Sequence, residues 1–156
     1  MSRKCRVIVD GGVYHIYNKI NACEYLLADS ETKDLFLKVL TEAKKIKEFR
    51  FRIKNLMIMN NHIHMQVKMD HGENLSKVMQ WIFSVFAQRY NRKYSRKGHL
   101  WIDRFKSKVI ESITTFEKVF EYITNNPVKA GIVNHAEDYE YGVFHISKKW
   151  IGLIDF

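Results

Sequence analysis

Alternation of apolar and polar residues is clearest between residues 62 and 69. The two alternating sets are Ile63, Met65, Val67 and Met69 on one side and His62, His64, Gln66 and Lys68 on the other. Successive side chains of a strand point to opposite faces, so this pattern predicts a strand with one buried face. Runs rich in β-forming residues predict further strands over 13–17, after the turn signal Gly11-Gly12, over 51–59 and over 105–110.

Helical periodicity occupies the segments between these strands. A first helix is expected from a cap at Asp29 or Ser30, with an apolar stripe of Leu35, Phe36, Val39, Leu40, Ala43 and Ile46. A second is expected over about 74–91, burying Leu75, Val78, Met79, Ile82, Phe83 and Phe86. Thr114 and Glu117 predict a capping box for a third, which ends near Asn125 and buries Phe116, Val119, Phe120 and Ile123. Pro127 and Gly131 are expected to close this region.

The element order β-α-β-β-α-β-α predicts an α+β fold with a mainly antiparallel sheet and helices packed on one face. A ferredoxin-like or RRM-like sandwich is the nearest architecture. No repeat or Gly/Ser/Pro-rich linker interrupts the chain, so we expect a single domain over residues 1–156. The helix-side face of the strands would be apolar, which leaves the opposite face free for chemistry.

Composition and net charge predict the cellular location of the protein and the class of partner that it binds. The two cysteines, Cys5 and Cys23, have neither zinc-finger nor CxxC spacing, so a disulfide scaffold and structural zinc both lack support. No apolar run approaches the roughly 20 residues of a membrane helix, and the N-terminus has no apolar signal core. We therefore expect a cytoplasmic protein with no membrane partner. The formal net charge of +9 favours a polyanionic partner, and nucleic acid is the commonest one.

Much of that charge lies between residues 89 and 108, where eight basic residues face one acid, Asp103. Tyr90, Tyr94, Trp101 and Phe105 are interleaved with the charges. Cations neutralise phosphates and aromatic faces stack on unpaired bases, so the segment predicts single-strand binding. The predicted DNA-binding residues are Arg89, Arg92, Lys93, Arg96, Lys97, His99, Trp101, Arg104 and Lys106. The alternative is a solvated basic surface whose aromatic residues belong to the core.

His62-Ile63-His64 is the sharpest local motif. Residues two apart on a strand share a face, so both imidazoles can reach one metal ion while Ile63 anchors the core. Imidazole suits zinc, manganese, nickel or iron, and accompanies magnesium when oxygen ligands complete the shell. The alternative is a chance pair of histidines on a solvated face.

Tyr122 and Asn126 lie one turn apart on the same flank of the predicted third helix. From there the phenol could face the histidine pair, and the Asn126 amide oxygen could be a third ligand. The alternative is a boundary tyrosine with its hydroxyl in water and an asparagine that only precedes the proline turn.

Four groups of residues in this order resemble the REP-associated tyrosine transposases, a branch of the single-tyrosine HUH transposase family. They are Gly12-Val13-Tyr14-His15-Ile16, Asn61-His62-Ile63-His64, Gly98-His99-Leu100-Trp101 with Arg104-Phe105-Lys106-Ser107, and Tyr122-Ile123 with Asn126-Pro127-Val128-Lys129-Ala130-Gly131. The resemblance spans nearly the whole chain. The chain departs from the family at Asn60, where a proline is common, and at Asn18-Lys19, where an arginine is common nearby.

The resemblance implies a metal-dependent single-stranded DNA endonuclease and strand transferase that acts on hairpin-containing ends. It implies Mg²⁺ or Mn²⁺ on His62 and His64, with Asn126 completing the protein ligands, and Tyr122 as the nucleophile that forms a 5′-phosphotyrosine and frees a 3′-hydroxyl. It also implies a bacterial, nucleoid-associated location, and a homodimer or a monomer. The remaining histidines, including His15, are expected to be structural or surface residues. The alternatives are a non-catalytic module that binds single-stranded DNA or RNA, and a replication initiator or relaxase, for which 156 residues leave little room.

Overall fold

A computed structural model describes residues 4–156; the first three residues of the predicted 1–156 domain lie outside the described residues. Four strands form one antiparallel sheet in the order β2-β3-β1-β4. Their bounds are Val13–Lys19 for β1, Phe51–Ile58 for β2, His62–Met69 for β3 and Lys106–Ile110 for β4. This strand order with the expected element order is the ferredoxin-like arrangement, and the predicted α+β class is confirmed.

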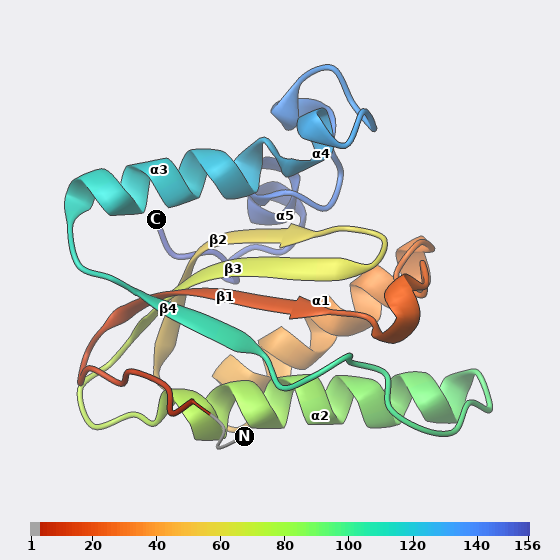
Figure 1. Ribbon diagram of the computed structural model, residues 1–156, viewed down its shortest axis with the longest axis horizontal. Helices are drawn as coiled ribbons and strands as arrows, with labels where there is room; N and C mark the ends of the chain where they lie inside the picture. The colour runs from red at the N-terminus through yellow and green to blue at the C-terminus, as the bar shows by residue number, and fades with distance from the viewer. Residues whose placement is uncertain (1–3) are drawn as a thin grey trace.

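Two long helices cover one face of the sheet, α1 (Ser30–Lys45) and α2 (Leu75–Lys93) (Figure 1). Asp29 caps α1 by accepting from Thr32 N–H at 2.8 Å, and Asn74 caps α2 by accepting from Lys77 N–H at 2.9 Å. The face beneath them, which we call the apolar face, carries Tyr14, Ile16, Ile63, Met65 and Val67, none more than 1% exposed. The predicted alternation of β3 and the predicted stripe of α2 are therefore confirmed.

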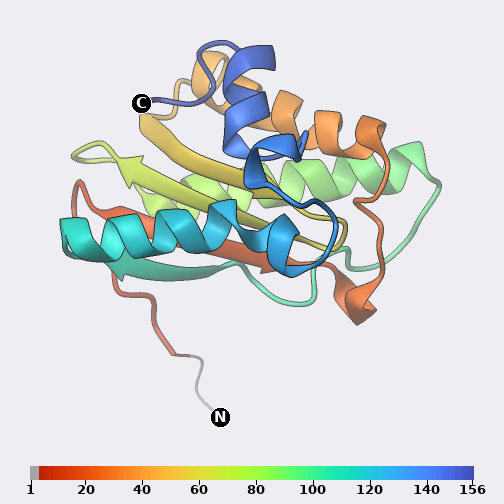
Figure 2. The same ribbon diagram turned by 90° about the horizontal axis from the view of Figure 1, so that it is seen from above.

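Helix α3 (Ile113–Thr124) lies on the other side of the sheet from α1 and α2 (Figure 2). We call that side the polar face, because β1 and β3 present His15, Tyr17, His64 and Gln66 there. The capping box predicted at Thr114 is wrong. Ser112 is the cap, because its extended backbone lets its Oγ accept from Thr115 N–H at 3.1 Å, and Thr114 lies inside the helix.

Four short elements of the described chain complete the fold, and the C-terminal segment packs against β2. The four elements are η1 (Asn21–Cys23), α4 (Asn126–Lys129), η2 (Ala136–Asp138) and α5 (Val143–Lys149). The sequence pattern predicts no element over residues 132–156, yet Ile154 bridges to Ile53 and Tyr139 donates its hydroxyl to Ile58 O at 2.7 Å. Ile46, expected in the stripe of the first helix, caps the helix end and is 73% exposed. No helix within residues 4–156 is long and apolar enough to cross a membrane.

Candidate active site

The register between β1 and β3 gathers four ring side chains on the polar face. Tyr17 pairs with His64 and His15 pairs with Gln66, so their side chains point the same way. The ring centroids of His62 and His64 are 5.1 Å apart, and those of Tyr17 and His64 are 4.9 Å apart. The two histidines of the motif therefore share a face, as the strand period predicted.

Asn126 lies between the two imidazoles. Its Oδ1 is 3.2 Å from His62 Nε2, and its Nδ2 is 3.5 Å from His64 Nε2. The predicted third helix ends at Thr124, and Asn126 begins the separate short helix α4. The predicted helical spacing from Tyr122 therefore crosses a helix break at Asn125, yet the amide still reaches the histidines.

The outer nitrogen of each imidazole has a partner of its own. His62 Nδ1 lies 2.7 Å from Asn61 Oδ1, and His64 Nδ1 lies 2.9 Å from His15 Nε2. In the tautomers that donate through Nδ1, both Nε2 atoms present a lone pair toward Asn126. Asn61 and His15 therefore fix the orientation of the two imidazoles, as a metal site would require.

The histidine cluster is held neutral by its surroundings. Burial lowers the pKa of His64 to about 3, with the neighbouring His62 and His15 adding to the effect. Burial also lowers the pKa of His62 and of His15, and for His15 the charge of Lys108 contributes. Neutral imidazoles keep the lone pairs that a metal ion requires.

Residues 4–156 hold no group of three or more His, Cys, Asp or Glu side chains arranged for a metal ion. The candidate donor set is instead two imidazole nitrogens and one amide oxygen. Ligands at right angles on an ion with bonds of about 2.1 Å stand about 3 Å apart, close to the 3.2 Å between His62 Nε2 and Asn126 Oδ1. His62, His64 and Asn126 therefore fit a divalent ion that takes its other ligands from oxygen.

Tyr122 borders this cluster from α3. Its ring centroid lies 5.6 Å from that of His64 and 6.1 Å from that of His15, and the side chain is 45% exposed. The Nζ of Lys129 lies 5.2 Å from the centre of the tyrosine ring. A phenol beside neutral imidazoles and open to solvent can meet a substrate that approaches from outside.

Two buried amides hold α3 in place. Asn55 of β2 donates to Phe120 O at 3.2 Å and to Thr124 Oγ1 at 3.1 Å, and Gln66 of β3 donates to Phe116 O at 3.0 Å. Both amides are fully buried, and their oxygens have no partner among residues 4–156. The helix that carries Tyr122 is therefore positioned by polar contacts with the strands.

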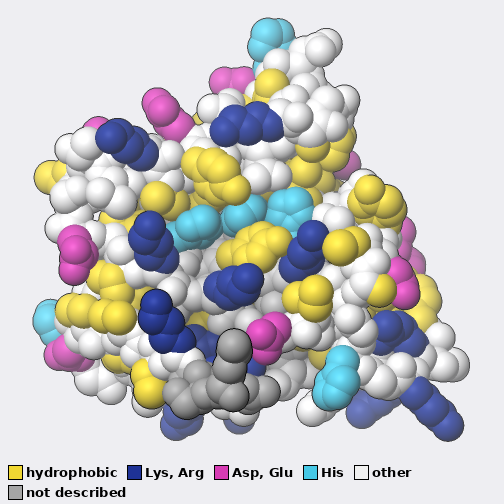
Figure 3. Space-filling view, viewed as in Figure 1, with side chains coloured by type: hydrophobic (Ala, Val, Ile, Leu, Met, Phe, Trp, Pro, Cys, Tyr) yellow, Lys and Arg dark blue, Asp and Glu magenta, His cyan; other side chains and the backbone are white. Residues whose placement is uncertain are grey.

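Positive charge surrounds the cluster. Lys106 and Lys108 of β4 pair with Tyr17 and His15, so they project from the same face. Lys19 ends β1 opposite His62. Figure 3 shows the histidine side chains as a band in the middle of this face, with Lys and Arg side chains on several sides of it. The field of the site favours an anionic substrate.

Some of the predicted DNA-binding side chains form hydrogen bonds with other residues of the chain, and others do not. Arg89 forms two 2.7 Å bonds with Glu42, and Lys93 contacts Glu31 at 2.7 Å, so both are engaged with α1. Arg96 donates to His99 O at 3.1 Å, and Trp101 donates to Phe83 O at 3.0 Å. Lys93 is exposed as well as paired, and the exposed members whose side chains have no hydrogen-bond partner within residues 4–156 are Arg92, Lys97, His99, Arg104 and Lys106. Binding of DNA by any of the nine stays a prediction.

Sequence reasoning missed His15, Asn55 and Gln66 as parts of the site. His15 was expected to be structural or on the surface, but it touches the candidate ligand His64. Its alternation with the buried Tyr14 and Ile16 could have placed it on the histidine face. Nothing in the sequence pairs the two amides with a helix about 50 to 70 residues away.

Comparison with known proteins gives one family match, one relative and two solved structures. Residues 9–126 match the model of the family described as IS200-like transposases. A Haemophilus influenzae protein named as a REP-associated tyrosine transposase is 24% identical over 109 residues, which cover 64% of this chain and 62% of that protein. A solved structure of a REP-associated tyrosine transposase bound to a REP hairpin has a TM-score of 0.79 at 22% identity, covering 99% of this chain and 89% of that one.

A Deinococcus radiodurans structure described as a transposase aligns with a TM-score of 0.53 at 16% identity. It covers 80% of this chain and 97% of that one. At these identities the two structures support the fold, whereas the family model, which matches most of the chain, supports the family. The resemblance stated from the sequence motifs is confirmed.

Proposed function

The chain belongs to the family of IS200-like transposases, and from this premise we propose that it cuts and rejoins single-stranded DNA through Tyr122. The observation that carries the proposal is the meeting of His62, His64, Asn126 and Tyr122 on one face, although they come from β3, α3 and α4. A non-catalytic binding module would need none of these side chains together.

The chemical step is a transesterification. The Tyr122 oxygen forms a bond to the phosphorus while the bond from phosphorus to the 3′-oxygen breaks. The leaving oxygen keeps the electron pair and gains a proton, and the phenol proton leaves to solvent. The products are a 5′-phosphotyrosine and a free 3′-hydroxyl, so attack by another 3′-hydroxyl can rejoin DNA without an external energy source.

Mg²⁺ or Mn²⁺ bound to His62, His64 and Asn126 would polarise the scissile phosphate and neutralise charge that builds up on it. The chain's own cations add to this effect, because Lys106, Lys108 and Lys129 border the same face. Asn61 and His15 keep the two imidazoles oriented. Asn55 and Gln66 keep the tyrosine helix against the sheet.

The substrate we propose is single-stranded DNA with a hairpin. Its support is the structural neighbour, which is described as bound to a REP hairpin. The positive field of the polar face and the exposed cations of residues 92–106 are consistent with a polyanion. The chain spans 62% of the length of its Haemophilus relative, so its full activity is part of the proposal.

A covalent-adduct assay tests the function. Wild-type protein is incubated with hairpin oligonucleotides from the flanks of its own gene and Mn²⁺, and the adduct is resolved on a denaturing gel. Tyr122→Phe should reduce the adduct below detection while the DNA dissociation constant changes less than about twofold, because one hydroxyl is lost and packing is kept. Tyr25→Phe is the control, since Tyr25 is 70% exposed and its ring contacts none of His62, His64, Asn126 and Tyr122 within residues 4–156.

His64→Ala should also abolish the adduct, through loss of the metal ligand, and higher Mn²⁺ should restore part of it. An adduct that persists in Tyr122→Phe would place the nucleophile on another tyrosine. No adduct from the wild type on any hairpin would favour the binding-module alternative.

A further inference from the structure

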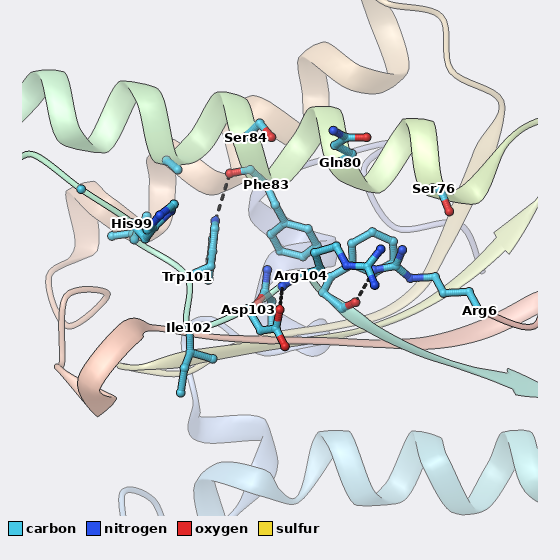
Figure 4. Close-up of a pocket in the computed structure, with 15 residues that line it drawn as sticks. Arg6, Ser76, Gln80, Phe83, Ser84, His99, Trp101, Ile102, Asp103 and Arg104 are labelled. Carbon is cyan, nitrogen blue, oxygen red and sulfur yellow. Dashed lines mark hydrogen bonds between the residues drawn. The ribbon is translucent and has the colours of Figure 1, made fainter. Parts of the chain in front are cut away.

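A cavity lies away from Tyr122, between α2, residues 98–105 and the N-terminal segment (Figure 4). Its volume is about 760 Å³, within the range of sites that enclose small molecules or single nucleotides. None of its lining residues belongs to the candidate active site. It borders α2, on the opposite side of the sheet from α3.

Aromatic side chains line the interior of this cavity. Phe83 stacks on Phe105 with ring centroids 5.9 Å apart, and it meets Trp101 edge to face at 5.1 Å. Trp101 is held in place, because its indole donates to Phe83 O and the flanking backbone bonds to β1 and to Asn21. Phe83 and Phe105 are only 4% and 6% exposed, so they support Trp101 from behind. Trp101 is partly exposed and is the ring on which an unpaired base can stack, whatever its identity.

Two guanidinium groups stand at the mouth. Arg6 lies over the Phe105 ring at 3.7 Å and donates to Phe105 O at 2.6 Å. Burial and the nearby charge of Arg104 lower the pKa of Arg6, while Asp103 is the one acid in the lining. Two cations with a single acid nearby leave net positive charge, which an anion such as a phosphate would neutralise.

Polar side chains line the α2 side. Ser76, Gln80 and Ser84 follow one another at single-turn spacing on α2 and belong to the cavity lining (Figure 4). None of the three side chains forms a hydrogen bond with another of residues 4–156. Hydroxyl and amide groups can donate to and accept from the edge of a base, which is how a pocket distinguishes one base from another.

A groove continues from this cavity along the free edge of β4. A second cavity of about 690 Å³ shares Arg6, Asp103, Arg104 and Phe105 with the first. It is lined further by Lys4, Lys106 and Lys108. Because Lys106 and Lys108 pair with Tyr17 and His15, the groove ends at the face that carries Tyr122.

We propose that the cavity beside Trp101 binds one unpaired nucleotide of the DNA strand whose scissile phosphate lies at Tyr122, with its base against the Trp101 ring and its phosphate between Arg6 and Arg104. The choice of DNA as occupant rests on the proposed function. The groove along β4 supplies the path between the two sites. Ser76, Gln80 and Ser84 then set which base is preferred.

The test fills the cavity from an exposed helix position. Gln80→Trp places an indole in the lining, and Gln88→Trp is the matched control, since Gln88 is exposed on the same helix and outside the lining. Both changes are made in Tyr122→Phe protein, so binding is measured without adduct formation. The probe is a hairpin oligonucleotide in which 2-aminopurine replaces each unpaired position in turn, and thermal unfolding checks that both variants fold.

In the parent, one position should lose fluorescence on binding, and changing that base should change the affinity. Gln80→Trp should weaken binding about tenfold, the range expected for one stacked base, and abolish that signal, while Gln88→Trp binds as the parent does. Equal binding by the two variants, or quenching that survives Gln80→Trp, would overturn the proposal. A wild type that forms no adduct but shows this pattern would overturn the proposed chemistry and leave the nucleotide pocket standing.

Discussion

Helices lie on both faces of the sheet, but they cover the two faces by different means. On the apolar face, α1 and α2 cover aliphatic and aromatic side chains, and α2 alone buries seven residues. On the polar face, α3 buries only Ile123 and Thr124 and is held by the amides of Asn55 and Gln66. Apolar burial stabilises in proportion to area, whereas buried polar groups roughly break even when bonded and cost stability when they are not.

This difference separates stability from chemistry. Burial on the apolar face contributes most of the free energy of folding. That contribution offsets the cost of keeping neutral imidazoles and unpaired amide oxygens out of water on the polar face. Such groups persist where function needs them, because other parts of the molecule supply the stability. Substitutions on the apolar face should therefore lower the free energy of unfolding and leave adduct formation nearly unchanged. Substitutions on the polar face should lower adduct formation and leave the free energy of unfolding nearly unchanged.

The largest expected effect on stability is on the apolar face. Phe36 of α1 is fully buried and packs against Phe86 of α2, with ring centroids 5.3 Å apart. Phe36→Ala should lower the free energy of unfolding by about 3–5 kcal/mol, because the lost burial adds to the cavity left behind. Chemical denaturation measures it. Adduct formation per folded molecule should stay within about twofold of the wild type.

Gln66→Met is the counterpart on the polar face. It conserves volume and removes the unpaired Oε1 together with the bond to Phe116 O, so the free energy of unfolding should change by no more than about 1 kcal/mol. Adduct formation should nevertheless fall, since α3 loses an anchor. A loss of stability as large as that of Phe36→Ala would show that the polar face holds the fold as well.

The next effect is a dependence of stability on pH. His64 has a folded pKa of about 3, below the ordinary value of 6.5, so between these values the unfolded chain binds a proton that the folded chain does not. The stability present above pH 6.5 is therefore lost as the pH falls toward 3, by up to about 1.4 kcal/mol per pH unit for one histidine. His62 and His15, whose pKa values are also lowered, act in the same direction.

Denaturation curves at pH 8, 6.5 and 5 measure this slope. Carboxylates contribute to it too, so the informative quantity is the difference between the wild type and His64→Asn, which should have the flatter profile. His135→Asn, at an exposed position, should follow the wild type. Parallel profiles for His64→Asn and the wild type would mean that the imidazole is as easily protonated in the folded chain as in the unfolded one.

The two faces also differ in how far the sequence predicts them. Alternation in β3 and the stripe of α2 identified the apolar face, because burial selects side chains by type at a fixed period. The same alternation placed His62 and His64 together. The contact of His15 with His64 depends on the register between β1 and β3, and the anchoring of α3 by Asn55 depends on tertiary packing, so neither leaves a local signal.

Two predictions from the sequence were incomplete or wrong, and in both cases the reason lies in the local surroundings of one residue. The cap of α3 was placed at Thr114 because a capping-box spacing was present there, but Ser112 has the extended backbone that a cap needs. The basic segment was treated as uniform, although Arg89 lies where Glu42 of α1 can pair with it. Charge counting along the chain does not distinguish a cation that faces a carboxylate from one that faces solvent.

The difference between paired and solvent-exposed cations predicts the smallest effect, which is on the salt dependence of DNA binding. Arg104 and Lys106 are exposed on the groove, whereas Arg89 is bound to Glu42 on the helix side. Each phosphate contact on a single strand contributes about −0.7 to the slope of log K against log salt. Arg104→Gln with Lys106→Gln should therefore flatten the slope by about 1.4, while Arg89→Gln leaves it unchanged and lowers stability slightly. Fluorescence anisotropy between about 50 and 200 mM salt resolves this difference. A slope that responds to Arg89 instead would move the DNA onto the surface near Glu42 of α1, away from the groove along β4.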